Sequence, residues 1–241
     1  GAGTSLPPAL TLAKAPPGGW GGIQGVLPTA ARRLSYSSLG SYGKCGYRFY
    51  LQRVLGLPEV APPPTPGQPE AVGLDPRVRG TLVHELLEHL DLRRMQPPEG
   101  DEVRVRAAAH GHELDDDQVA DLRGMVAAFL LSDTADRLRA AASVRREAPF
   151  AFPLEPGPRA PLLHGIVDVL ATERDGTALV VDYKSDRLGD ADPHALVTRD
   201  YGTQQALYAL AALRNSAPQA EVVYVFLERT ESPVAKTFTQ Q

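Results

Sequence analysis

The 241-residue chain contains a single cysteine, Cys45, so neither an internal disulfide nor a cysteine-only zinc or iron–sulfur site can form within it. It also lacks an apolar run long enough to cross a bilayer, and it does not open on a charged and then apolar signal segment. Its net charge is −4, whereas a protein that binds nucleic acid by itself is usually basic. We therefore expect a soluble cytoplasmic protein that does not associate with a membrane.

Hydrophobic residues make up 43% of the chain, which is enough for one sizeable core with an appended helical part. Many of the 22 glycines and 22 prolines lie in two stretches. Residues 1–32 are predicted to be an irregular tail or a linker from a preceding domain, and residues 58–77 a Pro-rich surface loop. Residues 33–241 are then expected to form one domain around that loop.

Apolar periodicity predicts mainly helices in the first part of this domain and mainly strands in the second. Helices are expected over 35–57, from a Thr81 cap to 92, and over 101–109, 115–131 and 133–142. Strands are expected over 145–154, 164–172, 178–184 and 221–227, with a helix over 201–214 before the last of them. This order of elements indicates an α/β fold.

The strongest chemical signal is a pair of apolar segments, one over 164–170 that contains Asp168 and one over 179–184 that contains Asp182 and Lys184, with Asp175-Gly176 between them. Such a turn predicts a hairpin, in which a three-residue loop sets Asp168 opposite Asp182 and a two-residue loop shifts the pairing by one. Side chains alternate along a strand, so Asp182 and Lys184 share a face. Two facing carboxylates repel unless a cation lies between them, which favours a divalent metal site. The competing interpretation of these charges is a salt bridge at the end of a half-exposed hairpin.

Two further pairs of residues with a four-residue spacing lie on predicted helices. His84 and Glu88 share a helical face, which fits either a metal-ligand position or an exposed surface pair. Gln204 and Tyr208 can either contact phosphates or bases, or belong to an amphipathic helix whose tyrosine packs in the core. A zinc protease is disfavoured, because the H-E-x-x-H motif and its inverted form need histidine at positions 88 and 85, where the chain has glutamate.

Taken in order, four segments resemble the RecB-like branch of the PD-(D/E)XK nucleases, in particular the C-terminal nuclease domain of UvrD/AddA-type bacterial helicase–nucleases. The first segment is 34–51, which begins with LSYSSL and ends with CGYRFYL, and the second is Arg79-Gly80 with His84 and Glu88. The third is GIVD at 165–168 followed by DYK at 182–184, and the fourth is Gln204 with Tyr208. The resemblance implies an α/β fold with a PD-(D/E)XK restriction-endonuclease-like core, a small mixed sheet flanked by helices, and an N-terminal helical part.

The resemblance implies a metal centre built from the matching residues. Asp168 and Asp182 would ligate the metal with their carboxylates, and the backbone carbonyl of Tyr183 would add a ligand. His84 matches the family's additional metal ligand on the preceding helix. Lys184 would orient or help to deprotonate the attacking water and stabilise charge on the phosphate. The implied metal is Mg²⁺, for which Mn²⁺ can substitute.

The resemblance also implies how the substrate is held and what is cut. Gln204 and Tyr208 would hold the substrate strand near the metal, and Glu147 and Glu88 are candidate accessory acidic groups. The implied activity is DNA phosphodiester hydrolysis, with exonuclease action favoured over endonuclease action. The substrate would be single-stranded DNA or DNA ends, delivered by a helicase motor in the same polypeptide or complex. This activity would serve double-strand break processing and recombinational repair at the nucleoid in the cytoplasm.

The sequence departs from relatives in two respects that narrow this interpretation. Cys45 occupies a position that ligates an iron–sulfur cluster in some relatives, but the three further cysteines are absent, so no such cluster forms from this chain. Gly43-Lys44-Cys45 lacks the residues of a P-loop, so the motor lies elsewhere. The alternative function is a catalytically inactive nuclease-fold module that binds DNA or a partner protein.

Overall fold

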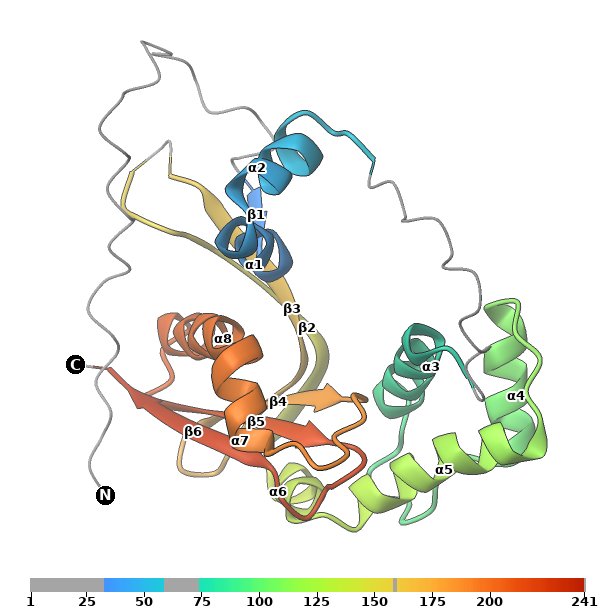
Figure 1. Cartoon of the computed structure of the whole chain (residues 1–241). Helices are drawn as coiled ribbons and strands as arrows, with labels where there is room; N and C mark the ends of the chain where they lie inside the picture. The colour runs from blue at the N-terminus through green and yellow to red at the C-terminus, as the bar shows by residue number, and fades with distance from the viewer. Residues whose placement is uncertain (1–32, 59–73, 158–159, 241) are drawn as a thin grey trace. The chain divides into compact units, whose positions relative to one another are not determined.

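The computed structural model describes residues 33–58, 74–157 and 160–240 (Figure 1). The predicted tail over 1–32 and most of the predicted loop over 58–77 lie outside the described residues. The chain divides into two compact units. The first takes in residues up to 63 and residues 149–166, and the second takes in residues 64–148 and 167–240. None of the described helices is both long and apolar enough to cross a membrane.

A mixed sheet forms the centre of the second unit. Its strands are β2 (Ser143–Pro153), β3 (Leu162–Thr172), β4 (Ala178–Lys184), β5 (Gln219–Phe226) and β6 (Val234–Thr239), and β2 and β3 continue into the first unit. The strand order is β3-β4-β5-β6, and β2 also pairs with β3. The β3–β4 and β5–β6 pairs are antiparallel, whereas β4 and β5 are parallel. The predicted small mixed sheet flanked by helices is therefore confirmed.

The β3–β4 hairpin has the first of the two registers that the sequence left open. Its three-residue loop ends at Gly176, whose φ of 88° lies in the left-handed region that glycine adopts without strain. The strands pair Val169 with Val181. One further step along the same register sets Asp168 opposite Asp182. The loop length therefore fixes which residues of the two strands meet at the other end of the hairpin.

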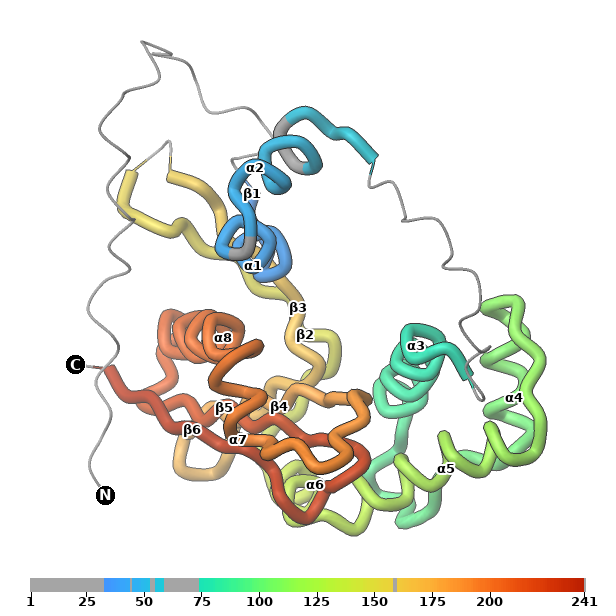
Figure 2. Tube along the Cα trace, in the orientation of Figure 1, coloured from blue at the N-terminus to red at the C-terminus, as the bar shows by residue number. Residues whose placement is uncertain are grey.

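Helices cover both faces of this sheet (Figures 1 and 2). On one face, the helices α3 (Pro76–Glu88), α4 (Gly100–Ala109), α5 (Asp116–Leu130) and α6 (Asp133–Ala140) share a continuous apolar core with alternate residues of β3, β4 and β5. On the other face, α8 (Gly202–Arg214) packs against β4 and β5. Because β4 and β5 are parallel, the chain crosses between them through α7 (Pro193–Leu196), η3 (Val197–Tyr201) and α8.

Two sequence predictions about the helix that carries His84 are wrong. The helix begins at Pro76 and not at a Thr81 cap, so the Pro-rich loop ends earlier than predicted. The Asp75 carboxylate accepts hydrogen bonds from the backbone N–H groups of Arg77 and Val78, and proline is well suited to the first helical position. The Thr81 hydroxyl donates to a carbonyl of the preceding turn instead. Elsewhere, β6 and α7 are elements that the sequence patterns did not predict.

The first unit is built on a short strand and three helical segments. They are β1 (Arg33–Ser35), α1 (Tyr36–Lys44), α2 (Gly46–Phe49) and η2 (Tyr50–Val54), so the predicted helix over 35–57 is interrupted at Cys45. Ser35 and Ser38 form a reciprocal capping box that starts α1. β1 pairs in parallel with the beginning of β3. The thiol of Cys45 accepts a hydrogen bond from the backbone N–H of Arg48, so the lone cysteine caps α2.

Phe129 provides a test of the core beneath β4. It is fully buried on α5, and its ring lies 4.9 Å from the Tyr183 ring in an edge-to-face arrangement. Replacing Phe129 with alanine should lower the free energy of unfolding by about 3–5 kcal/mol, because the substitution leaves a cavity. The matched control is Leu131→Ala at a position that is 76% exposed, which should change stability by no more than about 0.5 kcal/mol. Equal losses in urea unfolding would contradict this arrangement of the core.

Candidate active site

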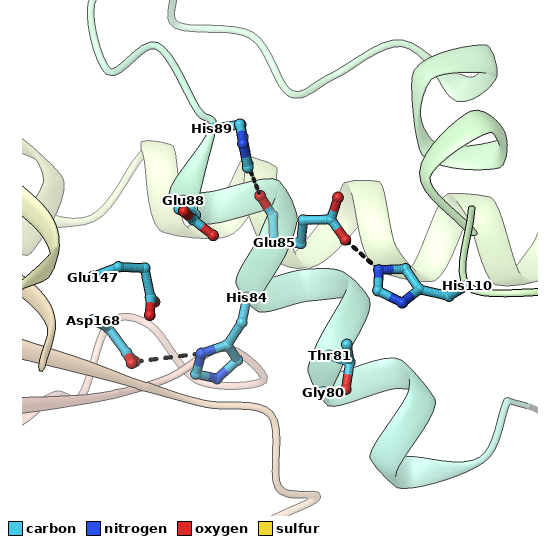
Figure 3. Close-up of a pocket in the computed structure, with 9 residues that line it drawn as sticks. All are labelled: Gly80, Thr81, His84, Glu85, Glu88, His89, His110, Glu147 and Asp168. Atoms are coloured by element: carbon cyan, nitrogen blue, oxygen red, sulfur yellow. Dashed lines mark hydrogen bonds and ion pairs between the residues drawn. The ribbon is translucent and has the colours of Figure 1, made fainter. Parts of the chain in front are cut away.

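Four of the predicted site residues, His84, Glu88, Glu147 and Asp168, line a cleft of about 680 Å³ in the second unit (Figure 3). The residues that line it come from α3, the turn after α4, β2 and β3, and they are Gly80, Thr81, His84, Glu85, Glu88, His89, His110, Glu147 and Asp168. We call this the catalytic cleft, after the role that we propose for it below. Asp182 and Lys184 are not among the lining residues, since their side chains are only 4% and 13% exposed.

Asp168 connects the hairpin to α3. Its Oδ2 accepts a hydrogen bond of 2.8 Å from the backbone N–H of Tyr183 and lies 3.4 Å from Nδ1 of His84. The His84 ring also lies beside the Tyr183 ring, at 6.1 Å between centroids in an edge-to-face arrangement. The structure therefore brings together three of the four predicted metal-ligand positions: the carboxylate, the imidazole and the backbone of Tyr183.

Asp182, the fourth position, lies beside Lys184. Oδ2 of Asp182 is 2.5 Å from Nζ of Lys184, so the predicted ion pair is present. The same oxygen is buried and accepts no well-aligned hydrogen bond. Buried carboxylate oxygens are normally satisfied, so this atom has capacity for a further positive ligand. The salt bridge and the metal site, which the sequence presented as alternatives, thus involve the same residues.

Electrostatics make this pair of carboxylates sensitive to added positive charge. Burial, followed by the repulsion of Asp182, raises the pKa of Asp168 to about 8. Burial lowers the pKa of His84, so its imidazole is neutral near pH 7 and keeps a lone pair for a ligand. Near pH 7, a pKa of about 8 favours the protonated form of Asp168, and a further positive charge beside it would favour the ionised form.

The residues present fit a hard divalent cation by their chemistry. Within the described part of the chain, no three acidic, histidine or cysteine side chains are already arranged around one point as a metal-binding group. The candidate donors comprise two carboxylates, one imidazole and one backbone carbonyl. A donor set of this kind, which is rich in oxygen and includes a buried carboxylate, is what hard divalent cations prefer.

Arg79 and Gly80 hold α3 against the end of β4. Arg79 is only 6% exposed, and its guanidinium donates to Asp121 at 2.7 Å and to the carbonyl of Ser185 at 2.8 Å. A Cβ on Gly80 would lie 2.9 Å from the Ser185 hydroxyl, so glycine permits this close approach. His84 lies one helical turn further along. Arg79-Gly80 belongs to a motif in the sequence, but its role could not be predicted there because nothing in the pattern shows that the arginine is buried.

Gln204 and Tyr208 point into the protein beneath Lys184. The Gln204 side chain donates to the Tyr208 hydroxyl at 2.9 Å and accepts from Nζ of Lys184 at 3.3 Å. Both residues are buried, and the first cause of the raised pKa of the Tyr208 hydroxyl is that burial. In this structure, Gln204 therefore contacts the predicted catalytic lysine, and neither side chain projects into the catalytic cleft.

Two tyrosines that the sequence motifs do not include complete the surroundings of Lys184. Nζ lies 4.1 Å from the ring centroid of Tyr201 and 5.3 Å from that of Tyr224. Aromatic faces attract cations, so these rings help to fix the ammonium group. The Tyr224 hydroxyl also donates to Oε1 of Gln204 at 3.3 Å. The alternation of β5 predicts an inward side chain at 224, but only the tertiary structure shows that it lies beside Lys184.

The two accessory acidic residues meet in the catalytic cleft (Figure 3). Burial, followed by the charge of Glu88, raises the pKa of Glu147. Glu147 has a φ of 44°, which is uncommon for a residue with a side chain and interrupts the regular geometry of β2. The structure thus adds a second acidic pair to the cleft that contains Asp168.

Proteins similar to this chain include several bacterial proteins named as ATP-dependent helicase/nuclease subunits. The chain is 34% identical over 195 residues to the protein from Desulforudis audaxviator, a match that covers 73% of this chain and 15% of that protein. It is 36% identical over 163 residues to the Desulfitobacterium hafniense protein, covering 58% and 11%. It is 31% identical over 165 residues to the Alkaliphilus oremlandii protein, covering 62% and 13%. The chain therefore spans a small part of the length of these relatives.

The family comparison covers nearly all of the described structure, including every residue of the site. The matching family generally uses divalent metal ions, in agreement with the donor set around Asp168 and Asp182. Residues 33–241 match the family model of the PD-(D/E)XK nuclease superfamily, and the chain belongs to that superfamily.

Proposed function

We propose that this chain is the nuclease part of a helicase–nuclease and that it hydrolyses DNA phosphodiester bonds with Mg²⁺, for which Mn²⁺ can substitute. The observation that carries the proposal is the convergence of Asp168, Asp182 and Lys184 at the end of the β3–β4 hairpin, with His84 held against them from α3. Family membership supports the same chemistry.

In this proposal, His84, the carboxylates of Asp168 and Asp182, and the backbone carbonyl of Tyr183 hold the metal. A bound divalent cation supplies Lewis acidity, which lowers the pKa of water and offsets charge on the phosphate. Lys184, which pairs with Asp182, donates hydrogen bonds that orient the attacking water and stabilise charge on the phosphate oxygens.

The residues around Lys184 set the direction of that ammonium group. We assign Gln204 and Tyr208 to holding the lysine beneath the substrate strand, since Gln204 hydrogen-bonds to both other side chains. Through Lys184 they contribute to holding the substrate phosphate. Glu88 and Glu147 are accessory acidic groups in the same cleft.

We further propose that the substrate is single-stranded DNA or a DNA end and that exonuclease action dominates. The relatives' names combine a helicase with a nuclease, which supports delivery of the strand by a motor in the same polypeptide or complex. The biological role proposed is double-strand break processing and recombinational repair in the cytoplasm at the nucleoid. A catalytically inactive module that binds DNA or a partner is disfavoured, because such a module has no need for two buried carboxylates, a lysine and a histidine in one place.

Asp182→Asn tests the catalytic assignment. The substitution keeps the size of the side chain but removes the charge that a metal needs, so cleavage of end-labelled linear single-stranded DNA in Mg²⁺ should fall by roughly 10²–10³-fold or more. The matched control is Asp175→Asn in the exposed hairpin loop, which should cut normally. Undiminished cutting by the Asp182 variant would rule out the assignment. Parallel assays on circular DNA, which an exonuclease leaves intact, separate exonuclease from endonuclease action.

Asp168→Asn tests the electrostatics of the carboxylate pair. The folded protein raises the pKa of Asp168 from 3.8 to about 8, so the unfavourable contribution of this carboxylate to stability grows as pH rises from 3.8 towards 8. In chelator, Asp168→Asn should therefore melt a few degrees above the unsubstituted chain at pH 8 and show little difference near pH 4.

Metal addition provides the second half of the same experiment. Mn²⁺ or Mg²⁺ should raise the melting temperature of the unsubstituted chain, because it binds the folded state, and should have much less effect on Asp168→Asn. A variant that is less stable than the parent at pH 8 in chelator would contradict the proposed carboxylate repulsion. Equal metal responses would contradict the proposed ligand.

A further inference from the structure

A second cleft, of about 610 Å³, lies in the same unit as the catalytic cleft. It is formed by the segment after α3, the end of α6 and the start of β2, and its lining residues include Arg93, Arg139 and Arg146. We call it the arginine cleft. We propose that the arginine cleft binds the sugar–phosphate backbone of the DNA strand whose scissile bond lies in the catalytic cleft. This inference rests on the proposed nuclease function and extends it by naming where the substrate runs.

The charge of the arginine cleft is opposite to that of the whole chain. Three arginines and one aspartate, Asp91, line it, so its side chains sum to 3 − 1 = +2 in a chain of net charge −4. Asp91 is already engaged, since its carboxylate accepts from the backbone N–H of Arg93 and lies 3.7 Å from the Arg94 guanidinium. A local positive cleft in an acidic protein attracts a polyanion to one place.

Two of the arginines are held in position by the fold. Arg139 donates to the carbonyl of Leu92 at 2.8 Å, and Arg146 donates to the carbonyl of Leu90. These carbonyls are neutral, so they orient the guanidinium groups without cancelling their charge. Arg139 also donates to the carbonyl of Leu130 and pairs with the exposed carboxylate of Asp136, which offsets its charge. All three guanidinium nitrogens of Arg139 are therefore engaged, and we assign the phosphate contacts to Arg93 and Arg146, since arginine forms paired hydrogen bonds with phosphate oxygens.

The arginine cleft adjoins the catalytic cleft. His89 lines both of them. On β2, Arg146 lines the arginine cleft and the next residue, Glu147, lines the catalytic cleft. Figure 3 shows His89 and Glu147 on the walls of the catalytic cleft. A strand with one phosphate beside Asp168 can therefore continue past His89 to the arginines. Such contacts are to phosphates, so they give grip and position without sequence preference.

Arg93 is the position of choice for a test, because its side chain is exposed and the fold does not depend on it. The variants are Arg93→Ala and Arg93→Glu. The matched control is Lys236→Glu, an exposed position on β6, at the opposite edge of the sheet from β3. Binding of fluorescent oligothymidylates of about 16 and about four nucleotides is measured in chelator over a range of salt concentrations. Cleavage of the same oligonucleotides is measured in Mg²⁺.

For the longer oligonucleotide, Arg93→Ala should reduce the slope of log affinity against log salt by about one, and Arg93→Glu should weaken binding by at least roughly three- to tenfold. In cleavage, KM for the longer substrate should rise by a similar factor while kcat stays unchanged. The shorter oligonucleotide, which fits the catalytic cleft alone, should respond to neither substitution. Lys236→Glu should resemble the unsubstituted chain with both lengths.

Several results would overturn the proposal. One is an unchanged slope of log affinity against log salt in both Arg93 variants, and another is equal weakening of binding for the long and short oligonucleotides. A third is a Lys236→Glu effect equal to that of Arg93→Glu, because binding would then depend on the net charge of the protein and not on the arginine cleft. Absence of any binding by the unsubstituted chain would also overturn it. If the chain binds with the predicted length dependence but does not cut in Mg²⁺ or Mn²⁺, the proposed nuclease function fails and the arginine cleft stands.

Discussion

The repulsion between Asp168 and Asp182 is the constraint on which the rest of the site depends. The hairpin register sets the two carboxylates opposite each other, and burial prevents water from screening them. Lys184 pairs with Asp182 and supplies one positive charge. Burying Asp168 beside this pair raises its pKa, so the arrangement is unfavourable by itself above pH 4. In the proposed function a divalent cation would offset this cost, and the site would trade stability for a binding capacity, as active sites commonly do.

The surrounding elements act by keeping that arrangement from relaxing. Movement of α3 away from the sheet would separate His84 from Asp168. The hydrogen bond from Arg79 on α3 to the carbonyl of Ser185, the residue after Lys184, opposes that movement. Lys184 could swing towards solvent, but Gln204 and the faces of Tyr201 and Tyr224 hold its ammonium group. Both faces of the sheet thus help to position the site residues. His84 lies on α3, which covers one face, and Gln204 lies on α8, which covers the other. A site assembled from both faces needs the whole unit to be folded.

Apolar periodicity and turn residues in the sequence predicted the strands and helices that hold the site residues. Tertiary packing determined how the side chains on those elements are oriented. Alternation along two apolar segments placed Asp182 with Lys184, and the Asp-Gly turn limited the hairpin to two registers. Glycine with a positive φ at position 176 suits both, and the structure has the three-residue loop, in which Asp175 does not adopt the positive φ that a two-residue Asp-Gly turn needs. The start of α3 was wrongly predicted at Thr81, although the sequence holds a signal for the correct start, because Asp75 is a good capping residue and is followed by proline at the first helical position. The inward orientation of Gln204 and Tyr208 was equally hidden, since a four-residue spacing serves a core-facing and a ligand-facing pair alike.

The acidic net charge, which argues against DNA binding when the sequence is taken as a whole, is compatible with a nuclease once charges are placed in space. Carboxylates gather in the catalytic cleft, where a cation reverses the local sign, while arginines line the adjoining cleft. Salt limits electrostatic attraction to about 10 Å, so a DNA strand at the site responds to these nearby charges more than to the net charge of the whole chain. An acidic net charge also suits the proposed delivery of the strand by a helicase motor, because the motor would then supply the affinity and this chain would need only to position one phosphate at a time.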